Sequence, residues 1–244
     1  MVLYGAGADS LDSAVAADKL GRAGFLQIFD YRGGRTAWAQ GGGQFEGDGP
    51  LPPAPSSPED TIYTVNPEKS RFEWMGCNLA STHRGTIRIA SGQINLEKGQ
   101  LSGGSFTLDM SSIQNTDLTD PDLRKMLENH LLSDDFFDAD RYPTAVLEIR
   151  RAELLPNPTP GAPNHTITAE LTLKDVSREI QFPAVVAVGE DGTLIANAQV
   201  EIDRTQWNVI YGSGRFFRML GKHLVNDSVT LNITLVAERS PVLT

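Results

Sequence analysis

Among the residues of this 244-residue chain that could perform catalysis or bind a metal ion, the cysteine and the histidines have no spacing that matches a recognised motif. Cys77 is the only cysteine, which excludes an intrachain disulfide, a CxxC redox pair and a multi-cysteine zinc site. A zinc site could be assembled from Cys77, His83 and one further histidine, but their spacing matches no recognised set of zinc ligands. The GxSxG motif of a hydrolase nucleophile is absent. We therefore expect neither a catalytic site nor a metal, and retain a sulfur-transfer enzyme acting through Cys77 as an alternative.

Two places in the sequence could contact the polar part of a ligand. His83 could donate a hydrogen bond, although a lone histidine more often has a structural partner. Asp203 and Arg204 lie at the end of a predicted strand, close to Trp207. This charged pair could orient a polar head group, or it could fix the strand end by hydrogen bonds to backbone, and the structural role is the commoner one.

The acidic run at residues 134–138 could belong to a metal site or an acid–base pair, but its two aromatic residues favour a structural role. We expect Phe136 and Phe137 to anchor the end of a helix in the core while the carboxylates face water. Asp120 can cap that helix, and Pro121 suits its first position. Its apolar stripe should pack on the strands, and consists of Leu123, Met126, Leu127, His130 and Leu131.

The composition describes a soluble globular protein with 40% hydrophobic and 21% charged residues. A net charge of -10 repels phosphate backbones, so nucleic acid is excluded as a partner. No apolar run approaches the roughly 18 residues of a membrane span, and the N-terminus does not resemble a signal peptide. We expect a cytoplasmic protein if Met1 is the natural start, and a periplasmic or exported one if a signal precedes it.

A segment rich in Gly, Pro and Ser at residues 41–58 is typical of a linker. It predicts a small N-terminal part over residues 1–45, a linker over 46–60 and a larger domain over 61–240. In the small part, an apolar strand at Val2-Leu3-Tyr4 precedes a helix that runs from a cap at Ser10 to Gly24. A second strand at Phe25–Phe29 completes a βαβ unit with parallel strands.

Beyond the linker, apolar and polar residues alternate with the period of two that indicates half-buried antiparallel strands. Roughly eight or nine such strands predict a barrel or a sandwich. The strand candidates are Arg71–Met75, Thr86–Ile89, Gln93–Leu96, Phe106–Met110, Ala145–Ile149, Ile167–Leu173, Ile180–Val188, Thr193–Ile202 and Val229–Leu235.

The side chains on the inward faces decide whether such a barrel is filled or encloses a ligand. Ala169, Ala196 and Ala198 lie on apolar faces where larger residues could have filled the interior. The alternation alone favours neither a filled barrel nor a cavity for a long apolar chain, which would be held by burial of its surface.

Residues from about Ile62 to Glu238 resemble the YceI-like family. The motifs that carry the resemblance follow one another as Tyr63-Thr64-Val65, Ser70-Arg71-Phe72, Thr82-His83-Arg84-Gly85-Thr86, Met110-Ser111-Ser112-Ile113, the helix running into His130–Phe137, Tyr142-Pro143, Leu171-Thr172-Leu173-Lys174 and Ile202-Asp203-Arg204-Thr205. The resemblance implies a mainly β fold, an antiparallel lipocalin-like eight-stranded barrel with one inserted helix, whose members bind isoprenoids or other long-chain amphiphiles. We expect ligand contacts in the barrel interior or at its mouth from His83, Phe106, Leu108, Ala169, Leu171, Ala198, Arg204 and Trp207.

The N-terminal part, with Val2-Leu3-Tyr4 and Gly33–Trp38, resembles the C-terminal half of a rhodanese domain. In that family a nucleophilic cysteine begins the loop after the first of these strands, and here the position is Gly5. Glycine carries no sulfur, so the resemblance implies a rhodanese-like fragment without sulfurtransferase chemistry. A two-stranded unit exposes apolar faces, so we expect the barrel, a second copy in a homodimer, or a protein partner to cover it.

The leading hypothesis is therefore a protein that is not an enzyme and that carries or sequesters a hydrophobic small molecule. The bound molecule would be an isoprenoid, an isoprenoid quinone or a fatty-acyl compound, and no cofactor is expected. The alternatives are a degenerate rhodanese module that recruits a protein partner, and the sulfur-transfer enzyme acting through Cys77.

Overall fold

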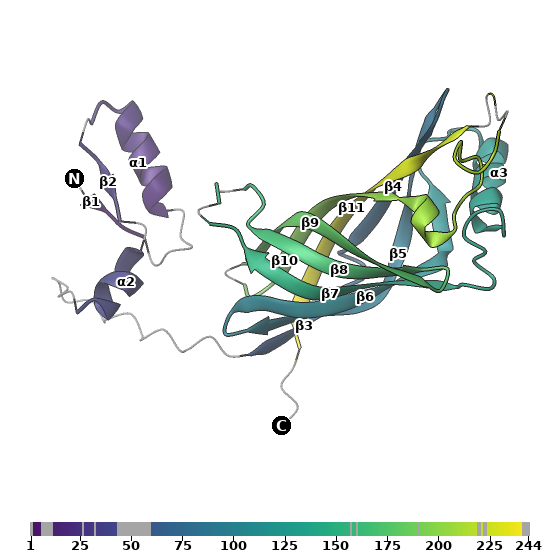
Figure 1. The fold of residues 1–244 in the computed structure, drawn as a ribbon. Coiled ribbons are helices and arrows are strands. Elements are labelled where there is room, and N and C mark those ends of the chain that lie inside the picture. The colour runs from purple at the N-terminus through teal and green to yellow at the C-terminus, as the bar shows by residue number, and fades with distance from the viewer. Residues whose placement is uncertain are drawn as a thin grey trace. The chain divides into compact units, whose positions relative to one another are not determined.

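The structure is a computed structural model, which describes residues 2–5, 12–25, 27–31, 33–42, 60–156, 158–159, 161–189, 191–218, 221 and 224–240. The chain divides into two units, Met1–Glu59 and Asp60–Thr244. Each unit is described by itself (Figure 1).

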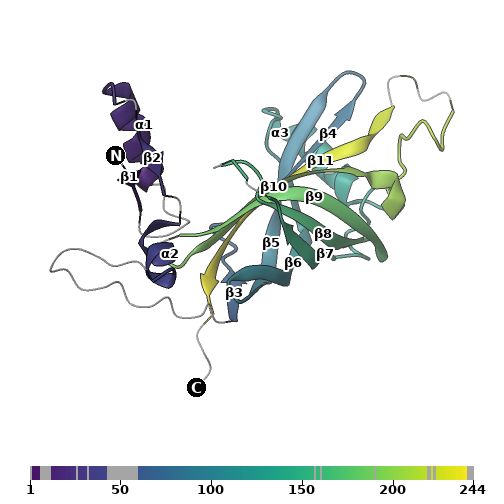
Figure 2. The same ribbon diagram turned by 60° about the vertical axis from the view of Figure 1, so that its left-hand side comes forward.

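The larger unit is a closed antiparallel barrel (Figures 1 and 2). Within the described residues, strands β4 to β11 each pair with the next along the chain, and β11 pairs back with β4 to close an eight-stranded ring. The short strand β3 also pairs with β5 and β11. It thus lies between the same two strands as β4, beyond the end of β4. The predicted mainly β, antiparallel eight-stranded barrel is confirmed. The strands are β3 (Thr61–Val65), β4 (Arg71–Asn78), β5 (Thr82–Glu97), β6 (Gln100–Asn115), β7 (Thr144–Leu154), β8 (His165–Leu173), β9 (Val176–Val188), β10 (Leu194–Asp203) and β11 (Val225–Arg239).

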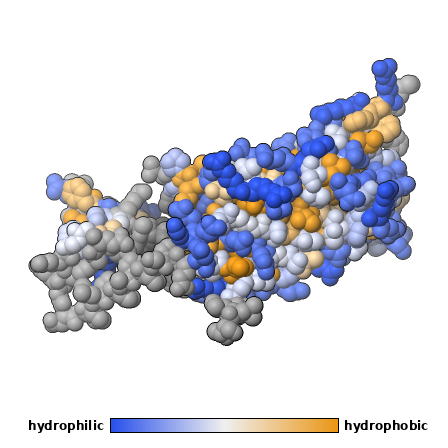
Figure 3. Space-filling model, turned by 60° about the horizontal axis from the view of Figure 1, so that its bottom comes forward, coloured by the Kyte–Doolittle hydropathy of each residue, from blue (hydrophilic) through white to orange (hydrophobic). Residues whose placement is uncertain are grey.

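Alternating burial along the strands builds one core inside the barrel. In β8, every second residue from His165 to Leu173 is buried. On the visible outer face in Figure 3, polar side chains surround small groups of apolar ones. The period of two in the sequence therefore gives the inside and the outside of the barrel.

Strand β5 is longer than the sequence predicts, because it joins two of the predicted strands. Its register shifts between Ile89 and Ser91, where a β-bulge adds one residue. Odd-numbered residues such as Ile87 are buried before the shift, and even-numbered residues such as Ile94 are buried after it. This change of face breaks the alternation and explains why the sequence shows two short strands.

Helix α3 (Pro121–Leu132) begins where the sequence predicts it. The Asp120 side chain accepts hydrogen bonds from the amides of Asp122 and Leu123. The predicted apolar stripe packs only in part, because Leu131 is buried whereas Met126 is 64% exposed. A short 3-10 helix, η1 (Arg204–Trp207), follows β10 and was not predicted.

The N-terminal unit contains β1 (Val2–Leu3), α1 (Asp12–Arg22), β2 (Phe29–Asp30) and α2 (Gly34–Gln40), and β1 and β2 pair in parallel. The strand predicted at Phe25–Phe29 is wrong at residues 25, 27 and 28, which are not in a strand, and correct at Phe29, whereas Leu26 lies outside the described residues. Gly24 ends α1 with a positive φ of 93°, and the Phe25 amide donates back to the Leu20 carbonyl. Phe25 thus belongs to the C-terminal cap of the helix. The predicted N-cap Ser10 lies outside the described residues. No helix of the described residues is long and apolar enough to cross a membrane.

Candidate functional site

A cavity of about 450 Å³ lies inside the end of the barrel that carries α3 and the segment after η1. Strands β4, β5, β6, β8 and β11 form much of its wall, and α3 contributes further residues. Most of the lining is apolar and includes Phe72, Ile87, Met110, Leu131, Leu171 and Leu231. Such a lining suits the hydrocarbon part of a ligand, because apolar burial then drives binding.

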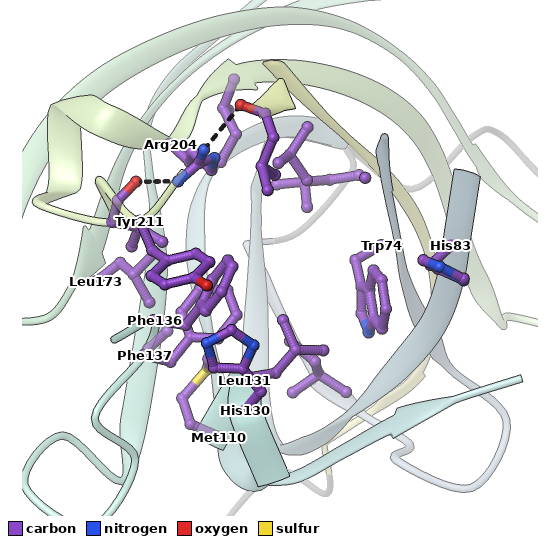
Figure 4. A pocket seen from close by; sticks show the side chains of 18 of the residues that line it. Trp74, His83, Met110, His130, Leu131, Phe136, Phe137, Leu173, Arg204 and Tyr211 are labelled. Carbon is purple, nitrogen blue, oxygen red and sulfur yellow. Dashed lines mark hydrogen bonds between the residues drawn. The ribbon is translucent and has the colours of Figure 1, made fainter. Parts of the chain in front are cut away.

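Arg204 reaches this wall but has little capacity left for a ligand. Its side chain is 4% exposed, and its guanidinium donates to the backbone carbonyls of Asn226, Val209 and Val225 at 2.9, 2.6 and 3.1 Å. Asp227 lies 3.7 Å away and offsets its charge. Burial lowers the pKa of Arg204, against the opposing effects of Asp227 and Asp203. Arg204 therefore joins η1 to the start of β11, as the structural interpretation of the sequence favours (Figure 4).

His83 is held between two partners at the end of β5. Its Nδ1 lies 3.0 Å from Asp117 Oδ2, and its Nε2 lies 3.0 Å from Ser81 Oγ. Asp117 also accepts hydrogen bonds from the Arg84 amide and from the Asn115 side chain. Partial burial acts to raise the pKa of Asp117, but these hydrogen bonds, with that of His83, lower it overall. Both ring nitrogens of His83 are thus engaged in a structural network.

Trp74 forms the wall opposite Tyr211 and Phe136 (Figure 4). It pairs with Gly85 on β5, where an added Cβ would come within 2.6 Å of the indole and 1.8 Å of the Gln114 carbonyl oxygen. Glycine at this position therefore makes room for the ring. The indole nitrogen is buried and has no hydrogen-bond partner within the described part of the chain.

An aromatic cluster of His130, Phe136 and Tyr211 closes another side of the cavity (Figure 4). The ring centroids of His130 and Tyr211 lie 4.6 Å apart with an interplanar angle of 86°. Phe136 lies 5.0 Å from His130 and 5.2 Å from Tyr211. Lys174 Nζ donates to the Phe136 carbonyl at 2.7 Å and fixes the backbone beneath the cluster. Phe136 is buried, as the sequence predicts.

The comparisons with known proteins agree with this architecture. A family model described as a YceI-like domain matches residues 63–237. The chain belongs to the YceI-like family.

Two solved structures share the fold of this YceI-like chain. The crystal structure of BcnA from Burkholderia cenocepacia is 23% identical, with a TM-score of 0.55, and the match covers 71% of this chain and 99% of BcnA. A polyisoprenoid-binding domain from Saccharophagus degradans, implicated in plant cell wall breakdown, is 12% identical with a TM-score of 0.53, and the match covers 74% of this chain and 99% of that domain. The comparison with curated proteins gave no match.

The YceI-like barrel divides the predicted contact residues into three groups. His83, Leu108, Leu171 and Arg204 line the large cavity. Phe106 and Ala198, together with Ala196, line a separate cavity of about 40 Å³. Ala169 and Trp207 are buried but line neither cavity. The Trp207 indole donates to the Leu171 carbonyl at 2.9 Å, which is a structural role. The large cavity is therefore not lined by Ala169, Ala196 or Ala198, the positions at which larger residues could have filled the interior.

Most of the lining residues were not predicted as contacts, and Trp74, Tyr211 and Gly76 are three of them. Tyr211 lies in an irregular segment and carries no periodic signal. An added Cβ at Gly76 would meet nothing within 4 Å, so open space lies in front of it. His130 was predicted only as part of the helix stripe.

The site also contains the single cysteine of the chain. Cys77 lines the cavity, and its Sγ lies 3.2 Å from Thr82 Oγ1. Across the described ranges, no group of three or more His, Cys, Asp or Glu residues could hold a metal ion.

Proposed function

We propose that this YceI-like barrel binds the apolar chain of a long amphiphile in the large cavity and so carries or sequesters it. The ligand classes considered are isoprenoids, isoprenoid quinones and fatty-acyl compounds. The observation that carries the proposal is a mostly apolar cavity of about 450 Å³ inside the barrel, in which His83 and Arg204 are engaged with the protein itself. The polyisoprenoid-binding domain that shares the fold supports the same ligand class.

In this proposal Leu108 and Leu171 contact the apolar chain, whereas His83 and Arg204 line the cavity mainly as structural supports. Ala169 lies on β8 between Ile167, which lines the small cavity, and Leu171, which lines the large one. A chain longer than the large cavity would therefore extend past Ala169 toward Phe106 and Ala198.

No catalytic step is assigned to the barrel. Cys77 contacts a threonine hydroxyl, and a sulfur-transfer reaction would also need a group that activates the thiol. For the N-terminal unit, we propose a rhodanese-derived fragment without this chemistry. The parallel pairing of β1 with β2 and the glycine at position 5 support that assignment.

The test is native mass spectrometry of the purified protein, followed by organic extraction and identification of the released compound. Gly76→Phe should fill the cavity, because no atom stands within 4 Å of the added Cβ. Gly103→Phe is the matched control, since Gly103 lies on β6 and lines neither cavity. We expect the wild-type protein and the control to carry the amphiphile and Gly76→Phe to lose it. A wild-type protein that is empty and refuses added geranylgeraniol would refute the proposal.

A further inference from the structure

The polar groups on the cavity wall differ in how many of their hydrogen bonds the protein already satisfies. Arg204 donates to three backbone carbonyls, and His83 uses both ring nitrogens. The hydroxyl of Tyr211 has no hydrogen-bond partner among the residues that the structure describes. His130 uses Nε2, which lies 3.3 Å from Asp135 Oδ2, and its Nδ1 has no described partner. The described lining groups with unused hydrogen-bonding capacity also include the Trp74 indole nitrogen and the Asn226 side chain. Among these groups, Tyr211 and His130 are in ring contact with each other and can act together on a polar part of the ligand.

These two side chains are neighbours and are held in place before any ligand binds. Their rings meet edge to face at 4.6 Å, and both pack on Phe136. The Arg204 guanidinium lies over the Phe136 ring at 5.9 Å, and Lys174 holds the Phe136 carbonyl. In Figure 4 the hydroxyl of Tyr211 points toward the enclosed space above the ring of His130. Fixed side chains lose little entropy on binding, so each hydrogen bond contributes more fully to affinity.

The pair offers one donor and one acceptor. A tyrosine hydroxyl donates, and the neutral histidine ring has one N–H and one bare nitrogen. When Nε2–H donates its hydrogen bond to Asp135, Nδ1 is the acceptor. A hydroxyl group is a small, neutral head group that can both donate and accept a hydrogen bond. We propose that Tyr211 and His130 form a head-group subsite that selects an amphiphile ending in a neutral hydroxyl, an alcohol or a phenol. This inference rests on the function proposed above, because it assumes that the apolar chain occupies the cavity.

The charge around the cavity favours a neutral head group over a phosphate or a carboxylate. Among the described lining residues, Arg204 is the permanently cationic group. It is 4% exposed, donates to three carbonyl oxygens and is offset by Asp227. Asp135 lies next to His130 and would repel an anion. An anion moved into such a site would lose its hydration without a free cation in return.

The experiment compares four probes that share one C20 isoprenoid chain, namely geranylgeraniol, its methyl ether, geranylgeranyl phosphate and the parent hydrocarbon. Their affinities for the full chain are measured by the change in tryptophan emission, with Trp74 on the cavity wall as the reporter. We expect the alcohol to bind about three- to tenfold more tightly than the hydrocarbon, as one or two hydrogen bonds provide. The ether, which only accepts, should lie between them.

Tyr211→Phe removes the hydroxyl and keeps the ring against Phe136. It should abolish most of the preference for the alcohol and leave the affinity for the hydrocarbon unchanged, and adding His130→Phe should remove the rest. Tyr142→Phe is the matched control, because Tyr142 lines neither cavity and its substitution should change nothing.

The outcomes separate the subsite from the cavity. If all four probes bind equally to the wild type and to Tyr211→Phe, the subsite is wrong and the cavity assignment stands. Tightest binding of the phosphate would overturn the choice of a neutral head group. If no probe binds the wild type, the proposed function fails, and the subsite fails with it.

Discussion

Trp74 on β4 faces Gly85 on β5, and the indole ring occupies the space that a side chain at position 85 would need. This pair makes one wall of the cavity. The pair also lies where β4 is hydrogen-bonded to β5. A bulky residue at position 85 would therefore disturb both the cavity wall and the pairing of these strands.

The first prediction concerns this pair. Gly85→Ala would bring a Cβ within 1.8 Å of the Gln114 carbonyl oxygen, which the backbone cannot accommodate without moving. We expect a loss of about 3 kcal/mol or more in the free energy of unfolding, measured by urea denaturation. Gly76→Ala on β4 is the control, because its Cβ meets open space and the change should be neutral or stabilising by about 0.5 kcal/mol. Equal losses in the two variants would contradict the steric explanation.

The second prediction concerns Arg204. Arg204→Met would keep much of the buried volume but leave three backbone carbonyls without donors, which should cost about 3 kcal/mol of unfolding free energy. Arg215→Met removes an arginine that is 63% exposed, although it pairs with Asp203 and Asp227, and should cost less than about 1 kcal/mol. Chemical denaturation of both variants measures the difference. A milder effect at Arg204 than at Arg215 would show that the buried guanidinium has another role.

The third prediction concerns acid stability. The pKa of Asp117 lies below its ordinary value of 3.8 in the folded protein, so the unfolded chain takes up a proton first as the pH falls. The stability that this carboxylate contributes is present well above pH 3.8, and it is lost as the pH falls through 3.8 and then through the lower folded-state pKa. Asp117→Asn should be less stable than wild type at pH 7, with the difference shrinking toward pH 3. The free energy of unfolding of both proteins is measured by denaturation at several pH values. A difference between them that does not change with pH would contradict the contribution of the Asp117 carboxylate.

The fourth prediction uses the single cysteine as a reporter. Cys77 lines the large cavity and is partly exposed, so iodoacetamide should alkylate it in the empty protein. Added geranylgeraniol should slow the alkylation several-fold, because a bound chain covers the thiol. Mass spectrometry of the alkylated protein over time gives the rate. An unchanged rate at saturating ligand would place the chain elsewhere in the barrel.

The fifth prediction addresses sulfur transfer. The wild-type protein and Cys77→Ser should both show only the background rate of thiosulfate:cyanide sulfurtransfer, since Cys77 contacts Thr82. In the proposed rhodanese-derived fragment, glycine at position 5 also carries no sulfur. Activity that disappears in Cys77→Ser would restore the enzymatic alternative.

The sequence by itself determined the half-buried antiparallel strands, because a strict period of two, as in Ile167–Leu173, allows one face to be buried and the other to meet water. The period left a barrel or a sandwich open, and the resemblance to the YceI-like family implied the barrel. It also determined the start of α3, since Asp120 and Pro121 act locally on the first turn. In these elements the deciding interactions lie within a few residues, so the order of residues contains them.

The tertiary structure decided the cavity and its polar groups. Three carbonyls, at Val209, Val225 and Asn226, gather around Arg204 only when η1 meets the start of β11, and this contact turns a candidate head-group ligand into a structural residue. His130 and Tyr211 come from α3 and from the segment after η1, and neither carries a local signal of its partner. Space and unused hydrogen bonds arise between distant segments, so only the folded barrel reveals where a ligand would lie.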